Sequence, residues 1–350
     1  MILISQRRDL EDPTVIRNFA SQVQTKENLV MLTLHTIADS QATSDKLWNG
    51  FKDSLLWQLY QKTMNVLEGA TDFIRAEETQ RALLQEEVLR LAPRTFSQEE
   101  VDAHFGSLPS RYFQIHPAKD IITDLSLAHR FMHHQLAEEE KALEPVLIWH
   151  NEVDRGYTSA KVCTWDRAGL FSKIAGSFSA AGINILSAQI FTRNDGIVLD
   201  TFFVTDARSG AMVDKEGREK FEDILLKVLT GQIEDLRPLI ARQKLARPLY
   251  QSLEGERIPL RVHYDNDSSE SRTVIDLETE DRLGLLYAIS HVFADLNLDL
   301  SLAKISTEKG AAIDTFYVCD NMGEKIYSTE YLRQIEREIH KAVASLDVPV

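Results

Sequence analysis

An internal repeat in the second half of the chain constrains its fold more than any other feature of the sequence. The pentapeptide Asp166–Leu170 (Asp-Arg-Ala-Gly-Leu) recurs as Asp281–Leu285 (Asp-Arg-Leu-Gly-Leu), an offset of 115 from 166 to 281. The run 200–204 (Asp-Thr-Phe-Phe-Val) likewise returns as 314–318 (Asp-Thr-Phe-Tyr-Val), now at an offset of 114. A one-residue deletion in the turn at Asn194–Gly196 accounts for the difference. Similarity kept in register over such a length indicates a duplicated structural unit.

Each copy of the repeat has the pattern strand, strand, helix, strand, strand, helix. Apolar residues at 170, 174 and 178 form the stripe of an amphipathic helix, and the runs on either side have strand character. The last helix of the first copy is expected over about 214–243. The pattern predicts one domain at 145–245 and a second at 257–350.

Residues 1–144 have helical periodicity and divide into two parts. Residues 1–70 are expected to hold three helices, the first opened by Asp12-Pro13, and residues 71–144 to form a helical connector. Leu29–Ala42 is apolar on most sides, which predicts a buried helix whose partners would lie upstream. We therefore expect residues 1–70 to expose an apolar face or to self-associate.

The composition disfavours several classes of function. Lys and Arg total 39 against 54 Asp and Glu, which gives a formal net charge of −15 and opposes non-specific binding to nucleic acid or anionic lipid. Cys163 and Cys319 are too few for a disulfide framework, and their apolar contexts favour core positions. No apolar run approaches the roughly 20 residues of a membrane span. The sequence thus predicts a soluble, cytoplasmic protein with no nucleic-acid or membrane partner.

The repeated unit resembles a known family of regulatory domains. A strand running into Asp-Arg-x-Gly-Leu, an amphipathic helix and then Gly-Ile-Asn-Ile at 182–185 is similar to the ACT domain. The resemblance implies an α+β fold in which an N-terminal α-helical part precedes two ferredoxin-like βαββαβ domains. It also implies amino-acid binding and control of an attached enzyme. Because ACT sheets commonly pair with one another, a homodimer through these sheets is a further expectation.

The same resemblance implies which residues hold the amino acid. The head group would be clasped by Asp166 and Asn184 in the first copy, and by Asp281 and Asp299 in the second. The glycine of the loop lets the backbone approach a ligand, and the helix start offers N–H groups to a carboxylate. The other predicted ligand-binding residues are Arg167, Gly169 and Leu170 in the first copy and Arg282, Gly284 and Leu285 in the second.

Two readings of these loops remain open. Both aspartates could instead serve only as caps of the helices that follow. If they do bind ligand, the difference between Asn184 and Asp299 predicts two unequal sites, with the first copy favoured.

The N-terminal half carries a second resemblance. The segments Gln6–Pro13, Ile37–Asp39 and Ser110–Phe113, together with Trp48, are similar to bifunctional PII uridylyltransferase/uridylyl-removing enzymes. In that family the last helices of an HD hydrolase domain lead through a connector to tandem ACT domains, so the resemblance covers nearly the whole chain. It implies that glutamine is the amino acid sensed, in nitrogen regulation, and that the PII signalling protein is the partner. Mg²⁺ is implied as the cofactor of the full-length family.

The catalytic signatures of that family are incomplete in this sequence. Its nucleotidyltransferase domain uses a Gly-Ser motif with paired carboxylates, but Asp265–Asp267 lies in a polar loop with no Gly-Ser directly before it. Its HD domain needs a His-Asp pair, which the sequence lacks, and only Asp39 matches a metal ligand by position. One carboxylate cannot hold a divalent ion tightly. We therefore expect an incomplete HD domain and a chain that binds no metal or cofactor and is not catalytic by itself. The alternatives are an active (de)uridylylating enzyme or phosphohydrolase, and a purely structural ACT module that dimerises.

Overall fold

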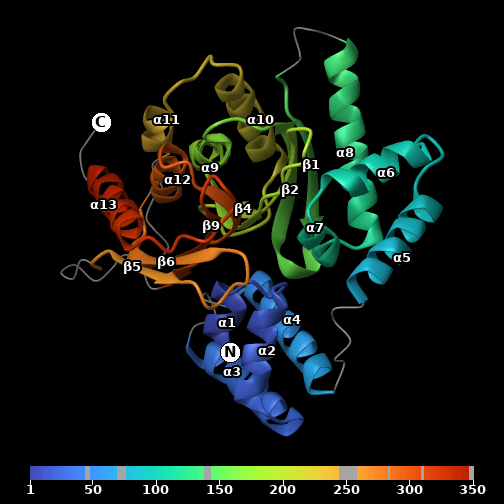
Figure 1. Ribbon diagram of the computed structural model, residues 1–350. Helices are drawn as coiled ribbons and strands as arrows, with labels where there is room; N and C mark the ends of the chain where they lie inside the picture. The colour runs from blue at the N-terminus through green and yellow to red at the C-terminus, as the bar shows by residue number, and fades with distance from the viewer. Residues whose placement is uncertain are drawn as a thin grey trace.

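One antiparallel sheet of nine strands forms the centre of the molecule, and both copies of the repeat contribute to it (Figure 1). The computed structural model describes residues 1–43, 48–68, 76–137, 143–243, 258–282, 284–308 and 311–346. The strand order is β1-β2-β4-β3-β7-β9-β6-β5, with β8 paired to β9. The first four strands in this order come from the first copy and the others from the second.

The described residues of the first copy form four strands and three α-helices. Its elements are β1 (Val146–Glu152), the 3₁₀ turn η2 (Val153–Arg155), β2 (Tyr157–Trp165), α9 (Leu170–Ala181), β3 (Ile183–Gln189), β4 (Ile197–Asp206), α10 (Lys215–Leu229) and α11 (Arg237–Arg242). The single helix expected over 214–243 is therefore wrong. Gly231, with φ +76°, follows the end of α10, and Pro238 stands in the first turn of α11, because proline is tolerated there and not in a helix interior.

The second copy repeats this arrangement. Its elements are β5 (Arg261–Asp265), β6 (Thr273–Glu280), α12 (Leu285–Asp295), β7 (Asp299–Lys304), β8 (Thr307–Glu308), β9 (Ala311–Cys319) and α13 (Thr329–Ser345). The predicted α+β class is confirmed, with one refinement. Each copy runs ββαββα along the chain, so β1 or β5, which completes the ferredoxin-like sheet, comes first rather than last.

The two copies join edge to edge through β3 and β7. Ala188 lies opposite Ala303 in this pairing, and the Ser187 hydroxyl donates to the Ala303 carbonyl at 3.0 Å. On one face of the sheet, α9 packs against α12. Gly176 allows this approach, since a Cβ there would lie 2.6 Å from Leu236 Cδ1 and 2.7 Å from Tyr287 Cδ2. Beneath these helices, buried apolar side chains from both copies form one continuous core.

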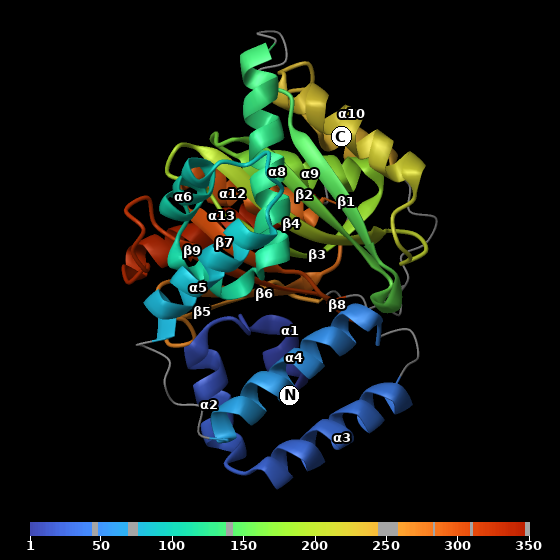
Figure 2. The same ribbon diagram turned by 90° about the vertical axis from the view of Figure 1, so that its right-hand side faces the viewer.

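A helical connector packs on the first copy (Figure 2). Its helices are α5 (Ala76–Leu91), α6 (Gln98–Ser107), α7 (Ser110–Ile115) and α8 (Ala118–Ala137). Buried Asp124 of α8 accepts from the Tyr112 hydroxyl at 2.7 Å and from Lys161 Nζ of β2 at 2.6 Å. His104 Nε2 lies 3.5 Å from the Tyr112 oxygen, and burial, aided by the charge of Arg193, lowers the pKa of His104 to about 4. This polar network fastens the connector to the sheet.

The N-terminal helices form a separate small cluster beneath the sheet. The described residues contain four helices here instead of the three expected, because a short helix precedes Asp12-Pro13. The four are α1 (Ile2–Arg7), α2 (Pro13–Val23), α3 (Lys26–Thr43) and α4 (Gly50–Leu67). As predicted, Asp12 caps α2, because the Thr14 N–H donates to Asp12 Oδ1 at 2.9 Å. The cluster also touches the first copy through the start of α4. A Cβ on Gly50 would overlap the Arg155 carbonyl, and the ring of Phe51 lies 5.2 Å from that of Tyr157.

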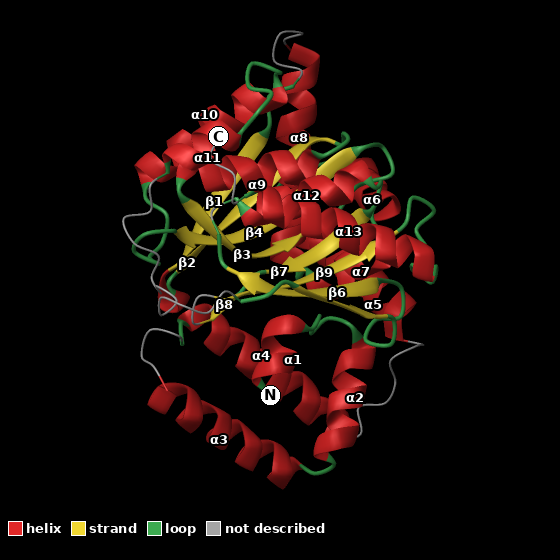
Figure 3. Ribbon diagram, turned by 90° about the vertical axis from the view of Figure 1, so that its left-hand side faces the viewer, coloured by secondary structure: helices red, strands yellow, loops and turns green. Residues whose placement is uncertain are grey.

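The helix α3 is the outermost element of this cluster (Figure 3). Leu29 is buried against the neighbouring helices, but Met31 is 72% exposed and Leu34 62%. The expectation of a buried helix at 29–42 is therefore wrong, because among the described residues α3 has packing partners on one side only. The expected exposed apolar face is confirmed.

Candidate functional site

Each repeated loop places a glycine, not an aspartate, at the start of the following helix. Gly169 precedes α9 with φ +69°, and Gly284 precedes α12 with φ +82°. Glycine adopts this left-handed conformation without the steric cost that a Cβ brings. Neither helix has a side-chain cap, so the reading of Asp166 and Asp281 as helix caps is wrong. Leu283, in the second loop, lies outside the described residues.

The first loop presents one exposed acidic side chain. Asp166 is exposed, and its backbone N–H donates to the Gly196 carbonyl at 2.8 Å. Arg167 Nη1 donates to the Leu229 carbonyl at the end of α10 at 2.9 Å, while its buried Nη2 has no hydrogen-bond partner, and desolvation lowers the pKa of Arg167. Leu170 is buried in the core. In this motif Asp166 is exposed and Gly169 is partly exposed, whereas the Arg167 guanidinium reaches the end of α10.

The second loop is more heavily engaged by the protein itself. Asp281 Oδ2 accepts from the Thr307 hydroxyl at 3.0 Å. Desolvation raises the pKa of Asp281, against the opposing effect of the Thr307 hydroxyl and the Arg282 N–H. The Arg282 guanidinium donates to Glu280 Oε2 at 3.1 Å, and Leu285 is buried.

Asn184 and Asp299 lie far from the loops of their own copies. Each begins a strand that follows the helix, and the 12 residues of α9 span roughly 18 Å. Because β3 and β7 pair antiparallel, the start of each strand lies at the end of the sheet that carries the other copy's loop. The pairs expected to clasp a ligand within one copy are thus not brought together.

A cavity opens where the first loop meets the second copy. Its volume is about 380 Å³. Its lining comes from the start of α9, the segment from the end of α10 to the start of α11, and one side of α12. The lining residues are Ala168, Gly169, Ser172, Lys173, Val228, Gly231, Ile233, Glu234, Leu236, Tyr287, His291, Ala294 and Asp295. Of the residues predicted from the sequence, Gly169 lines this cavity.

The chemistry of the cavity lining is mixed. Lys173 supplies a cation beside the amides at the start of α9, where the helix dipole also favours an anion. Glu234 and Asp295 supply carboxylates, and His291 Nδ1 lies 3.2 Å from Asp295 Oδ2. Ile233 and the other apolar side chains complete the wall. Such a cavity can hold a small zwitterion with a short side chain.

The equivalent position beside the second loop is occupied by the protein. A Cβ on Gly284 would lie 3.4 Å from Ile240 Cγ2 of α11 and 3.9 Å from Leu346 Cδ2. Next to it, Gln243 Nε2 donates to the Ala180 carbonyl at 2.6 Å. The segment α11 has no counterpart in the second copy among the described residues, so the two loops have unequal surroundings.

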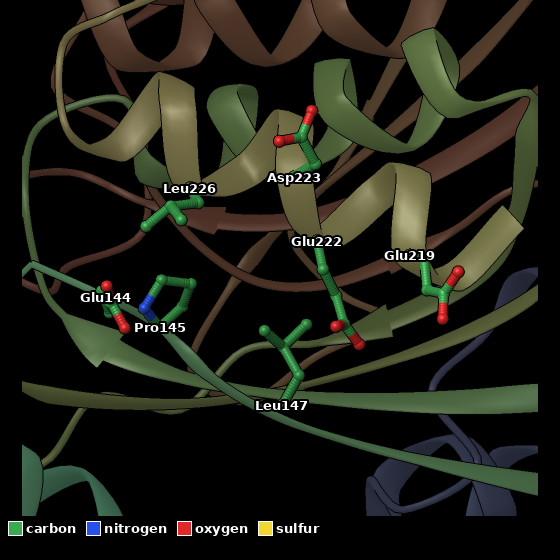
Figure 4. Close-up of a pocket in the computed structure, with 7 residues that line it drawn as sticks. All are labelled: Glu144, Pro145, Leu147, Glu219, Glu222, Asp223 and Leu226. Atoms are coloured by element: carbon green, nitrogen blue, oxygen red, sulfur yellow. The ribbon is translucent and has the colours of Figure 1, made fainter. Parts of the chain in front are cut away.

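A second cavity, of about 320 Å³, lies between β1 and α10 (Figure 4). Glu222 and Asp223 project from α10 on one side, and Leu147 of β1 lies on the other. Glu222 accepts from Trp149 Nε1 at 2.6 Å, and Asp223 pairs with Lys227 at 2.6 Å. These carboxylates already have partners, and this cavity contains no residue of the repeated loops.

Sequence reasoning missed a pair of buried carboxyls at equivalent positions of the two copies. Burial raises the pKa of both Asp200 and Asp314 well above the usual range. Asp200 accepts from the Phe191 N–H at 3.2 Å, and Asp314 Oδ1 has no hydrogen-bond partner. The repeated Asp-Thr-Phe run was the available signal, because an aspartate among apolar strand residues is seldom found buried without a specific role.

The described residues contain no group of three or more His, Cys, Asp or Glu side chains placed to hold a metal ion. Asp39 lies on the exposed side of α3. Cys163 and Cys319 are both buried, as predicted, and burial raises the pKa of Cys319 to about 11, which opposes a nucleophilic role. Within the described part of the chain no helix is both long and apolar enough to cross a membrane.

Comparisons with known proteins agree with this architecture. Residues 161–225 match the ACT domain, and residues 268–345 match the N-terminal ACT domain of the ACR family. The protein is therefore one with two ACT domains.

Particular relatives resemble almost the whole chain. Bifunctional uridylyltransferase/uridylyl-removing enzymes from Azospirillum brasilense, Rhodospirillum rubrum and Vibrio cholerae are 33%, 32% and 30% identical over 97%, 96% and 94% of this chain. The predicted resemblance to that family is confirmed. The chain spans 35% to 36% of the length of these relatives, and its tandem ACT domains fit their C-terminal portion.

A solved structure gives a much weaker likeness. The crystal structure of aspartate kinase from Synechocystis covers 54% of this chain, with 27% of its own chain aligned, at 14% identity and a TM-score of 0.29. A likeness at this level has no bearing on function.

Proposed function

We propose that this chain is the amino-acid-sensing, regulatory portion of a uridylyltransferase/uridylyl-removing enzyme, and that glutamine is its ligand. The observation that supports this most is the cavity of about 380 Å³ at the junction of the two ACT copies, which offers charges of both signs around the uncapped start of α9. Homology supports the regulatory role, and the choice of glutamine rests on the family resemblance.

The proposed binding mode follows from the charges around the cavity. The α-carboxylate of glutamine would lie at the start of α9 beside Lys173, and the α-ammonium between Glu234 and Asp295. The amide side chain would extend along Ile233 toward Tyr287. Asp166, exposed at the same loop, would supply negative charge near the entrance. The chain's own residues thus bind and orient the ligand, with no bond made or broken.

Other properties of the longer relatives are part of the same proposal. We assign the ACT domains to 145–245 and 257–350, the connector to 71–144 and the last HD helices to 1–70. The PII protein would be the partner, Mg²⁺ the cofactor of the longer enzyme, and the cytoplasm the site of action. This chain by itself would catalyse neither uridylyl transfer nor uridylyl removal, and release of UMP from uridylylated PII in the presence of Mg²⁺ would contradict that part.

Isothermal titration of glutamine into the purified chain tests the ligand. We expect one binding event, weakened about tenfold or more by Asp295→Asn, because one charged contact is worth roughly 1.5–3 kcal/mol. Asp223→Asn, the same change in the second cavity, is the matched control and should leave affinity unchanged. Asp166→Ala should weaken binding more than Asp281→Ala, whose carboxylate is already held by Thr307. No heat at millimolar glutamine would overturn the proposal.

A further inference from the structure

The segment that follows α1 is held against the second ACT copy by a paired charge. Arg8 Nη1 and Nη2 donate to Asp276 Oδ1 and Oδ2 of β6, both at 2.8 Å. Asp276 also accepts from the Thr315 hydroxyl of β9 at 2.7 Å. Two parallel charge-assisted hydrogen bonds fix distance and orientation together. Arg8 therefore holds the end of α1 in one position on the sheet.

Asp9 links three parts of the molecule at one point. Its backbone N–H donates to the hydroxyl of Tyr317 on β9 at 2.6 Å, and its Oδ2 accepts from Arg111 Nη2 of the connector helix α7 at 2.6 Å. Asp9 is 5% exposed. The energy of a buried carboxylate and its charged partner depends strongly on their relative position, because moving either group leaves the other desolvated and unpaired.

Lys304, the last residue of β7, reaches α1 directly. Its Nζ donates to the Ser5 carbonyl at 3.3 Å, and the residue is 8% exposed. The free energy of this buried ammonium group is sensitive to small shifts of α1 or β7, since its burial is costly without the contact with the carbonyl. We call Ser5, Arg8 and Asp9, with Asp276, Lys304 and Tyr317, the latch.

The strand β7 connects the latch to the cavity. The cavity wall includes Ala294 and Asp295 at the end of α12, and β7 begins four residues after Asp295. From Asp299 to Lys304 the strand covers roughly 17 Å, and it pairs with β3 of the first copy on one side and β9 on the other. The strand therefore provides a direct chain connection from the end of α12, which lines the cavity, to Lys304.

We propose that the latch makes the N-terminal helices α1 and α2 respond to occupancy of the cavity, with β7 as the connecting element. This regulatory coupling rests on the proposed function, because it takes the amino-acid ligand as its input. The output is the position and local stability of α1 and α2, the elements that would carry the signal to the remainder of a longer enzyme.

Hydrogen exchange measured on the full chain with and without glutamine tests the coupling. We expect exchange of amides in residues 2–23 to differ about fivefold or more between the two states, the lower end of ordinary allosteric couplings. In Lys304→Met the difference should vanish while the heat of glutamine binding persists. Arg8→Gln should have the same effect by a second route. Arg17→Gln, which removes the exposed pair with Glu270 in the same region, should keep the wild-type response.

The outcomes separate the two proposals. No heat of binding in the wild-type chain overturns the proposed function and this coupling with it. Heat without any change of exchange in residues 2–23 overturns the coupling alone. A response that is still retained in Lys304→Met and Arg8→Gln, with both variants folded, overturns it as well. A response confined to α4 would instead assign the signal to the contact of Phe51 with the first copy.

Discussion

The two ACT copies share a loop sequence and a fold but differ in what the rest of the chain places around them. The first loop opens on a cavity, and the connector covers the other face of that copy's sheet through the Asp124 network. Ile240 occupies the space beside Gly284 of the second loop, and the strands of the second copy contact the latch through Asp276. A duplicated unit thus acquires different roles through segments outside the repeat, one copy suited to bind and the other to transmit.

The largest expected effect concerns the stability of the contacts that attach the connector to the first copy and the N-terminal segment to the second. Asp124→Ala should lower the free energy of unfolding by about 3–5 kcal/mol, because it leaves Lys161 buried without its partner. The matched change Asp276→Ala should cost less, about 1.5–3 kcal/mol, since Arg8 keeps some contact with water. Urea unfolding of both variants measures the difference. Equal losses would contradict the contrast between the two attachments.

Acid should weaken the attachment of the first copy selectively. The pKa of His104 is lowered to about 4, so between pH 6.5 and 4 the unfolded chain binds a proton that the folded chain does not. Unfolding free energy should therefore fall as the pH drops through this window, by roughly 3 kcal/mol for this group. The unfolding free energy of His104→Asn should depend less on pH than that of the wild-type chain, as measured by urea unfolding at pH 7 and pH 4.5. Identical slopes would show that His104 is not the group responsible.

The smallest expected effect on stability comes from a substitution that makes the surroundings of the two loops more alike. Ile240→Ala should cost about 2 kcal/mol in unfolding free energy, the low end for such a truncation because the short helix α11 can relax. It should also open space beside Gly284, so that titration with glutamine changes from one binding event to two. A single event of unchanged affinity would mean that Ile240 is not what closes the second loop.

The repeat predicted the units of this fold well and their mutual arrangement poorly. Gly182 and Asn297, which follow α9 and α12, adopt the left-handed conformation with φ +83° and +52°, and glycine and asparagine are the residues that favour it at a helix end. The pairing of β3 with β7 was not predictable, since both strands are apolar and a repeat does not say which edges meet. For that reason Asp166 and Asn184 were expected together and lie at opposite ends of the sheet.

The cavity was the part of the site hardest to find from sequence. Lys173, Tyr287 and Asp295 lie on helices of different copies, and no local pattern brings them together. The break between α10 and α11, by contrast, had a visible signal in Gly231 and Pro238. The apolar character of α3 was correctly recognised, but periodicity cannot tell whether a partner is present to cover it.

Sharing one sheet has a consequence for how the protein can be divided. In the described part of the chain, the seam between β3 and β7 leaves β1 and β5 as the terminal strands. Expressing either copy alone would expose the backbone groups of β3 or β7 that pair across the seam, and unpaired edge groups of this kind are the usual template for association between chains. An isolated copy should then associate with a second molecule through the exposed edge of β3 or β7. The two ACT copies therefore cannot be separated without changing their association state, unlike tandem domains that are joined only by a linker.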